Sequence, residues 1–207
     1  MEAAIDAGAD MIGLVFYRAS PRYVSVRVAK QLAGLARDRI EIVALVVDAN
    51  DATLDEIAAE IGPDWLQLHG IETPDRVEAI LKRFQTPLIK ALAVKDPGDL
   101  ASTAAYEAVA DMILFDTKAP AGATRPGGHG RPFDWTILQG AALDRPFMLS
   151  GGLNSGNVAD AIRIARPAAV DVSSGVETAP GQKSPDLISA FVAAARLTVV
   201  APETAIS

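Results

Sequence analysis

The chain has 207 residues, half of them hydrophobic and 22% charged, and a net charge of −7 at pH 7. This length and composition fit one globular domain, and the acidic balance disfavours a nucleic-acid partner, because phosphate backbones need a basic face. There is no cysteine, which excludes disulfides and thiolate metal sites. No apolar run reaches the ~18 residues of a membrane span, and the N-terminus does not resemble a signal peptide, so we expect a cytoplasmic protein without a membrane partner.

Apolar stretches of strand length alternate with amphipathic stretches of helix length along the chain. Seven strands are predicted, starting at Met11, Glu41, Trp65, Leu88, Met112, Phe147 and Ala168. Good N-cap residues precede the helices, such as Ser25, Thr73 and Asp134, and a last helix starts at Ser184. This alternation predicts a parallel sheet covered by helices, and we expect residues 1–207 to form a single (β/α) barrel domain.

Two consecutive predicted strands end in small residues. Ser150-Gly151-Gly152 follows the first, and Ser173-Ser174-Gly175 follows the second. Glycine lets a backbone approach a ligand closely, and backbone N–H groups in such turns can point at an anion. In a (β/α)8 barrel the loops after strands seven and eight meet at one phosphate site, so the pattern predicts a phosphate site here. The alternative is a pair of ordinary tight turns without a ligand.

Polar side chains interrupt or end several of the predicted strands. Asp116 ends one strand and Asp171 lies within another, while His69 directly follows a third. Active sites of barrels lie at strand carboxyl ends, and burying an unpaired carboxylate is costly, so these side chains are expected at the barrel mouth. Asp116 could instead cap loop N–H groups, and Asp171 could form a structural ion pair. Gln67 and Lys90 also interrupt strands, and could face the interior for structural reasons alone.

The least regular segment runs from Lys118 to Pro132 and contains four glycines and three prolines. Long loops within compact domains are usually functional lids or disordered, and this segment is interpreted as a lid over the site.

Several motifs occur in an order that is specific as a set. They are Gly8-Ala9-Asp10 with Ser20-Pro21-Arg22-Tyr23-Val24, Gln67-Leu68-His69-Gly70, Phe115-Asp116-Thr117-Lys118 with Gly127-Gly128-His129-Gly130, Ser150-Gly151-Gly152-Leu153-Asn154, and Val170-Asp171-Val172-Ser173-Ser174-Gly175-Val176-Glu177. Together they resemble the phosphoribosylanthranilate isomerases of tryptophan biosynthesis, and the resemblance covers Gly8 to about Leu197.

The resemblance implies a (β/α)8 barrel that uses no metal and no organic cofactor. Its activity would be the Amadori rearrangement of N-(5′-phosphoribosyl)anthranilate to 1-(2-carboxyphenylamino)-1-deoxy-D-ribulose 5-phosphate. Asp116 would be the general acid that opens the ribose ring by protonating its oxygen. Arg22 would face the anthranilate carboxylate, His69 would lie near the aromatic ring, and Asp171 would contact the sugar hydroxyls. The phosphate would bind at Gly128, Gly152, Ser173, Ser174 and Gly175.

One part of the family pattern is not found in this sequence. The family's general base is a cysteine in a Lys-Ile-Cys-Gly motif of the first strand, and this sequence has neither. The resemblance therefore predicts that the first βα unit is missing, through a start codon assigned too late or a truncated chain, and that the chain is inactive or nearly so. The resemblance leaves the oligomeric state as monomer or homodimer.

Two other functions remain open on the sequence alone. One is a different phosphate-sugar barrel enzyme, such as an epimerase or an indole-glycerol-phosphate synthase relative. His69 and His129 lack metal-ligand spacing, which argues against the epimerase, and Lys90 alone does not supply the synthase's catalytic lysine and glutamate. The other is a phosphate-ligand-binding protein without turnover.

Overall fold

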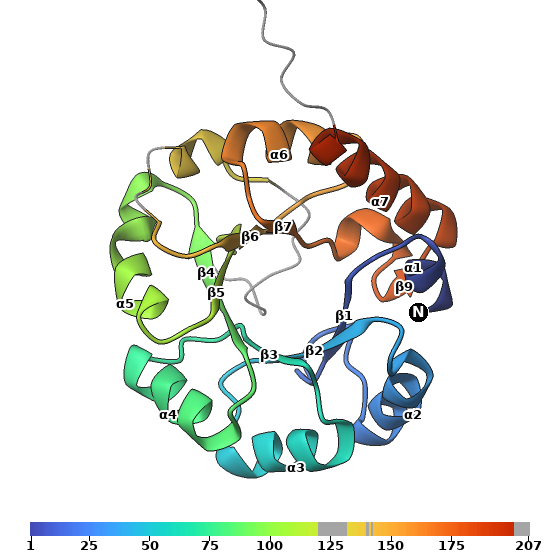
Figure 1. Ribbon diagram of the computed structural model, residues 1–207, viewed down its shortest axis with the longest axis vertical. Coiled ribbons are helices and arrows are strands. Elements are labelled where there is room, and N and C mark those ends of the chain that lie inside the picture. The colour runs from blue at the N-terminus through green and yellow to red at the C-terminus, as the bar shows by residue number, and fades with distance from the viewer. Residues whose placement is uncertain (120–131, 140, 142, 201–207) are drawn as a thin grey trace, which may run out of the picture.

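The main sheet of the computed structural model, which describes residues 1–119, 132–139, 141 and 143–200, consists of seven parallel strands. In spatial and chain order they are β1 (Met11–Val15), β2 (Glu41–Val46), β3 (Trp65–Leu68), β4 (Leu88–Val94), β5 (Met112–Thr117), β6 (Phe147–Leu149) and β7 (Ala169–Val170). The sheet curls around a central axis with helices outside it (Figure 1). The predicted parallel α/β architecture is confirmed, although the last strand begins at Ala169 rather than Ala168.

The helices cover the outer face of the sheet. They are α1 (Glu2–Asp6), α2 (Val26–Ala36), α3 (Asp51–Ile61), α4 (Pro74–Phe84), α5 (Thr103–Glu107), α6 (Val158–Ala165) and α7 (Pro185–Val200), with 3-10 turns η1 (Pro97–Ser102), η2 (Trp135–Leu138) and η3 (Ser174–Val176). The predicted caps at Ser25 and Thr73 are confirmed, because their hydroxyls accept hydrogen bonds from the Val28 and Arg76 N–H groups.

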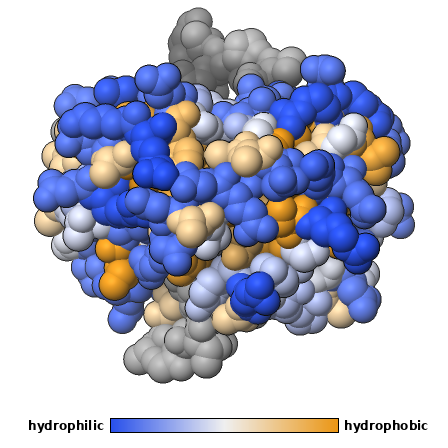
Figure 2. Space-filling model, turned by 90° about the horizontal axis from the view of Figure 1, so that it is seen from below, coloured by the Kyte–Doolittle hydropathy of each residue, from blue (hydrophilic) through white to orange (hydrophobic). Residues whose placement is uncertain are grey.

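Alternation along the strands separates two apolar layers. Side chains pointing to the central axis form a small inner cluster of Val43, Ile89, Ala91, Leu114 and Met148. Side chains on the other face, such as Ile42 and Leu66, pack against the helices in a much larger cluster. The outer helices turn their polar sides to solvent, and on the face in Figure 2 hydrophobic residues form only small separated groups. In the described ranges no helix is both long and apolar enough to cross a membrane.

The two end strands of the sheet, β1 and β7, lie at opposite ends of the strand order. Several contacts link the segments next to them. Arg196 of α7 binds Asp10 before β1 at 2.6 Å, and a short antiparallel hairpin after β7 reaches the loop after β1. That hairpin, β8 (Glu177–Ala179) and β9 (Gln182–Lys183), was not predicted. Its turn residue Gly181 has φ +83°, and a Cβ there would lie 2.7 Å from the Pro21 carbonyl oxygen, so the two loops touch.

Candidate active site

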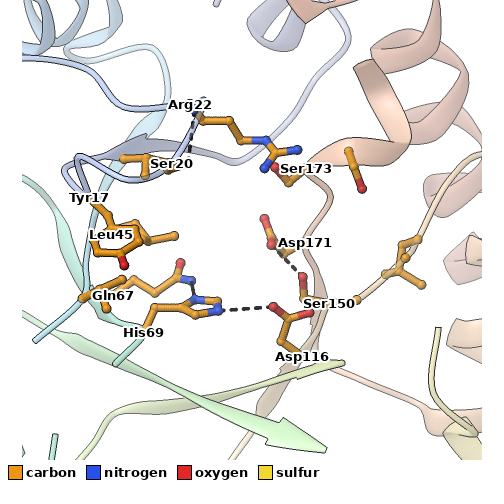
Figure 3. A pocket seen from close by; sticks show the side chains of 16 residues that line it. Tyr17, Ser20, Arg22, Leu45, Gln67, His69, Asp116, Ser150, Asp171 and Ser173 are labelled. Carbon is orange, nitrogen blue, oxygen red and sulfur yellow. Dashed lines mark hydrogen bonds and ion pairs between the residues drawn. The ribbon is translucent and has the colours of Figure 1, made fainter. Parts of the chain in front are cut away.

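A pocket lies at the carboxyl ends of the strands, where parallel strands of this architecture place their functional loops. Sixteen residues line it (Figure 3). They are Val15, Tyr17, Ser20, Arg22, Leu45, Val47, Gln67, His69, Asp116, Ser150, Gly151, Gly152, Leu153, Asp171, Ser173 and Ser174. The four residues that the sequence singled out for catalysis or substrate binding are all in this set, so the fold brings them together from the ends of four different strands.

His69 and Asp116 form a hydrogen-bonded pair in the pocket. The His69 Nε2 lies 3.2 Å from Asp116 Oδ2, and the His69 Nδ1 lies 3.0 Å from the Gln67 amide nitrogen. The other Asp116 oxygen accepts the backbone N–H of Thr117 at 2.7 Å. Asp116 is buried, and it belongs to β5 rather than to the loop after it. The strand therefore fixes the carboxyl group at a defined position, as acid–base chemistry requires.

Asp171 follows β7 and points into the pocket near Asp116 (Figure 3). Its Oδ2 accepts a hydrogen bond from the Ser150 hydroxyl at 2.9 Å. Burial raises the pKa of the Asp171 carboxyl above its ordinary value; the Ser150 hydrogen bond opposes this rise, and the neighbouring Asp116 charge adds to it. The pocket therefore holds two carboxyl groups in different surroundings, which is an arrangement that can separate their protonation states.

Arg22 lines the pocket but is already paired with a carboxylate of the protein. Its Nε and Nη2 each donate to one oxygen of Glu177 at 2.7 Å. The pair is largely buried, because the Arg22 and Glu177 side chains are only 12% and 4% exposed. A substrate carboxylate at this arginine would therefore meet the edge of the guanidinium that Glu177 does not occupy.

The small-residue loops after β6 and β7 pack directly against each other. A Cβ on Gly175 would lie 1.9 Å from the Leu153 carbonyl oxygen in the loop after β6. The loop after β6 also packs against β5, because a Cβ on Gly151 would lie 2.3 Å from Thr117 Oγ1. Gly151 and Gly152 also have φ of +88° and +67°, which L side chains rarely adopt. Only glycine fits this approach, and Gly152 and both loop serines line the pocket.

Only some of the residues predicted to bind phosphate line the pocket. Ser173 and Ser174 line the pocket with Gly152, whereas Gly175 packs behind them against the loop after β6. Gly128 and His129, with most of the predicted lid, lie outside the described residues.

Behind the pocket, Lys90 is buried on the helix-facing side of the sheet rather than in its interior. Its Nζ donates to Glu72 Oε2 at 2.7 Å and to the Gly70 carbonyl at 2.8 Å. Glu72 in turn accepts the Asp48 and Gly70 N–H groups. This network holds the loop that starts at His69. Lys90 therefore stabilises that loop and does not line the pocket.

Three residues at or beside the pocket were assigned no functional role from the sequence. Gln67 was a candidate only for the interior, Ser150 was part of a motif, and Glu177 was the last residue of another. The period-2 alternation of β3 could have placed Gln67, because it shares a face with its register partner Ile89 of the inner cluster. Within the part of the chain that the structure describes, no three His, Asp or Glu side chains are grouped as metal ligands.

Comparisons with known proteins agree with this geometry. A family model described as N-(5′phosphoribosyl)anthranilate (PRA) isomerase matches residues 1–194. An N-(5′-phosphoribosyl)anthranilate isomerase of Rhodopseudomonas palustris (strain BisA53) is 57% identical over 197 residues, which are 95% of this chain and 90% of that protein.

Solved structures give the same result. The phosphoribosyl anthranilate isomerase of Thermotoga maritima matches with a TM-score of 0.85 at 36% identity, over 94% of this chain and 92% of that one. A phosphoribosyl anthranilate isomerase in complex with reduced 1-(o-carboxyphenylamino)-1-deoxyribulose 5-phosphate matches with a TM-score of 0.81 at 33% identity, over 94% and 91% of the two chains. Monomers generated from the dimeric T. maritima isomerase match with a TM-score of 0.81 at 34% identity, over the same shares. The chain therefore belongs to the N-(5′-phosphoribosyl)anthranilate isomerase family, the isomerases of tryptophan biosynthesis.

Proposed function

We propose that this pocket converts N-(5′-phosphoribosyl)anthranilate to 1-(2-carboxyphenylamino)-1-deoxy-D-ribulose 5-phosphate, with the residues in the roles that the family resemblance implies. The observation that carries the proposal is the convergence of Asp116, His69 and Asp171 on one pocket with the two small-residue loops. Such a pocket offers an acid at one end and an anion site at the other. The substrate needs both, because it carries a phosphate and a ring oxygen that must be protonated.

In this mechanism Asp116 is the general acid. It gives its proton to the ribose ring oxygen as the bond between that oxygen and C1′ breaks, and the anthranilate nitrogen forms a double bond to C1′. A general base then removes the C2′ proton, and the electrons move back towards nitrogen to give an enolamine. Loss of the proton from its C2′ hydroxyl, with protonation of C1′, then gives the ketose. Asp171 contacts the sugar hydroxyls, and Gly152, Ser173 and Ser174 hold the phosphate. His69 lies beside Asp116 and near the aromatic ring.

The substitution Asp116→Asn tests the acid. It keeps the side-chain shape and removes the proton donor, so we expect kcat to fall by about 10²–10⁴-fold, the usual contribution of general acid catalysis. The reduced product analogue should still bind within a few-fold of wild type, because the phosphate and carboxylate contacts are untouched. Undiminished turnover by Asp116→Asn would contradict the assignment.

We also propose that a segment outside the given 207 residues supplies an eighth parallel strand, which pairs between β1 and β7, carries the family's cysteine base and completes a single barrel domain. Two observations support this. The inward-facing Gly13 of β1 is exposed with open space beside it, and β1 and β7 are the end strands of the sheet. Strand edges with unpaired N–H and C=O groups favour pairing.

A turnover assay tests the strand. The 207-residue chain is compared with a version that carries an N-terminal extension containing Lys-Ile-Cys-Gly. We expect turnover to depend on the extension and on its cysteine. Equal and robust activity of the two proteins would show that the base lies elsewhere. Oligomeric state, as monomer or homodimer, is a separate measurement by light scattering.

A further inference from the structure

The ion pair between Arg22 and Glu177 joins a pocket residue to a residue outside the pocket. Arg22 belongs to the loop after β1 and lines the pocket, whereas Glu177 begins β8 and is not among the lining residues. In Figure 3 the guanidinium of Arg22 is on the opposite side of the pocket from His69 and Asp116. Glu177 therefore holds the arginine from behind, through two parallel hydrogen bonds of 2.7 Å.

A two-point pair of this kind fixes the plane of a guanidinium as well as its position. The pair uses the Nε–H and one Nη2–H, so Nη1 is the amino group that Glu177 does not engage. Without a partner for its guanidinium, the Arg22 side chain would sample many rotamers, and ligand binding would have to restrict them at a cost in entropy. The pair with Glu177 restricts these rotamers in the folded protein before a ligand binds.

Glu177 is also held as a charged group. Lys183 of β9 donates to its Oε1 at 2.9 Å and to the Ser173 carbonyl at 2.8 Å. Partial burial alone would raise the pKa of the Glu177 carboxyl, but the hydrogen bonds from Arg22 and Lys183 outweigh it and lower this pKa to about 2. The carboxylate is therefore ionised at neutral pH, and the two cations around it leave one net positive charge in this group of three side chains.

We propose that Glu177 is a positioning residue for substrate selection: it aims the free edge of Arg22 at the carboxylate on the aromatic ring of the substrate. This inference rests on the proposed function, which supplies that carboxylate. It assigns Glu177 no contact with the substrate. Its effect is on which ligands bind, because only a ligand with the ring carboxylate gains from an aimed guanidinium.

The pair could also serve only to stabilise the fold, and that role must be distinguished from the positioning of Arg22. The Arg22–Glu177 pair ties the loop after β1 to the hairpin after β7, so its loss could simply loosen the fold. The pair between Asp10 and Arg196 offers a matched control, since it also links the segments next to β1 and the chain's last helix, through 2.6 Å contacts. Neither of these two residues lines the pocket.

The experiment measures binding by calorimetry for the variants Glu177→Gln, Glu177→Asp and Asp10→Asn. The probes are the reduced product analogue, the same compound without its ring carboxylate, and inorganic phosphate. Glu177→Gln replaces one acceptor by an amide NH₂ that cannot accept from Arg22. We expect it to weaken the carboxylate-bearing analogue about tenfold, or about 1.4 kcal/mol, while the other two probes change less than about twofold. Asp10→Asn should leave all three affinities within about twofold, even if it lowers the melting temperature.

Equal losses for the analogues with and without the carboxylate would overturn the proposal in favour of a mechanical role, and so would no loss for either. Glu177→Asp keeps the charge with a shorter reach, and should lose about two- to fourfold of the affinity for the carboxylate-bearing analogue alone, so the test holds even if Glu177→Gln does not fold. If the wild-type chain binds phosphate but neither analogue, the proposed substrate is wrong, and that outcome differs from any selective change in the variants.

Discussion

The hydrogen bond between Gln67 and His69 determines which imidazole nitrogen carries the proton. The Gln67 amide nitrogen only donates, so the His69 Nδ1 3.0 Å away must accept. A neutral His69 then carries its proton on Nε2, where it faces Asp116 at 3.2 Å. Gln67 is buried on β3, so it cannot turn to solvent to avoid this contact.

We therefore predict that neutral His69 is predominantly the Nε2–H tautomer, measured by ¹⁵N NMR at pH 8. Gln67→Leu removes the donor and should give a mixture of tautomers, with turnover reduced about tenfold or more, because the proton facing Asp116 is no longer fixed. The chain has two histidines, so a His129→Gln variant identifies the His69 signals. An Nδ1–H tautomer in the wild type would contradict the prediction.

Residues at strand ends could be predicted from the sequence, whereas their partners could not. Asp116 ends an apolar stretch, His69 follows one and Asp171 lies near the end of one, and parallel strands bring such positions to one edge. Glu177 lies 155 positions from Arg22, and no local pattern connects two side chains at that separation. The role of Arg22 was inferred from resemblance alone, and the partner on its other edge came only from the three-dimensional structure.

At the scale of elements, the close contact between the loops after β6 and β7 depends on Gly175. A Cβ there would lie 1.9 Å from a backbone oxygen, which cannot move as a flexible side chain would. We predict that Gly175→Ala separates the two loops, weakens inorganic phosphate about tenfold or more, and lowers stability by about 1–3 kcal/mol through strain. Calorimetry with phosphate and thermal unfolding measure the two effects.

Gly34→Ala is the matched control for that substitution. Gly34 lies exposed within the helix α2, and no atom lies within 4 Å of the position that an added methyl group would occupy. Replacing it should raise stability by about 0.5–1 kcal/mol and leave phosphate affinity unchanged. If Gly175→Ala bound phosphate as Gly34→Ala does, the contact between the loops would not be what forms the anion site.

Long periodic elements were predicted well, and short ones were not. Capping residues and apolar stripes located the helices from α2 to α4 to within a few residues, since propensity, caps and periodicity all agree there. The hairpin β8–β9 has strands of three and two residues without an apolar alternation, and its one signal is the Pro180-Gly181 pair at the turn. The segment Trp135–Leu138 is an exception: its helical bounds and its Asp134 cap were predicted, and only its 3-10 type was not.

For the whole molecule, the number and direction of the strands in the main sheet followed from the alternation of strand and helix, but the way the ends of that sheet are linked did not. The structure links the segments next to β1 and β7 through side-chain ion pairs and the hairpin contact. Electrostatics therefore contributes to holding the curled sheet together, and the pH dependence of stability reports on it.

Glu177 and Asp171 should make opposite contributions to that pH dependence. The pKa of Glu177 falls from 4.5 to about 2 on folding, so its contribution is fully present above 4.5 and is lost as pH drops towards about 2. The pKa of Asp171 rises above 3.8 on folding, so Asp171 favours the folded state below 3.8, and this contribution is lost as pH rises through the folded-state pKa. At pH 7, Glu177 therefore stabilises the fold and Asp171 destabilises it.

Thermal unfolding at pH 7 and pH 4 separates the two effects. We predict that Glu177→Gln lowers the melting temperature at pH 7 by about 2–6 °C, and that Asp171→Asn, which can still accept the Ser150 hydrogen bond, raises it by about 2–4 °C, since 1 kcal/mol is worth about 2–4 °C at this chain length. Both differences should shrink at pH 4, because Glu177 is then partly protonated in the unfolded state and Asp171 is partly protonated in the folded state. A gain for Asp171→Asn that grew on acidification would have the wrong sign for a carboxyl group whose pKa burial has raised. A residue that served only stability would not be expected to destabilise the fold at neutral pH. A higher melting temperature for Asp171→Asn is therefore the result expected if the Asp171 carboxyl group serves substrate binding.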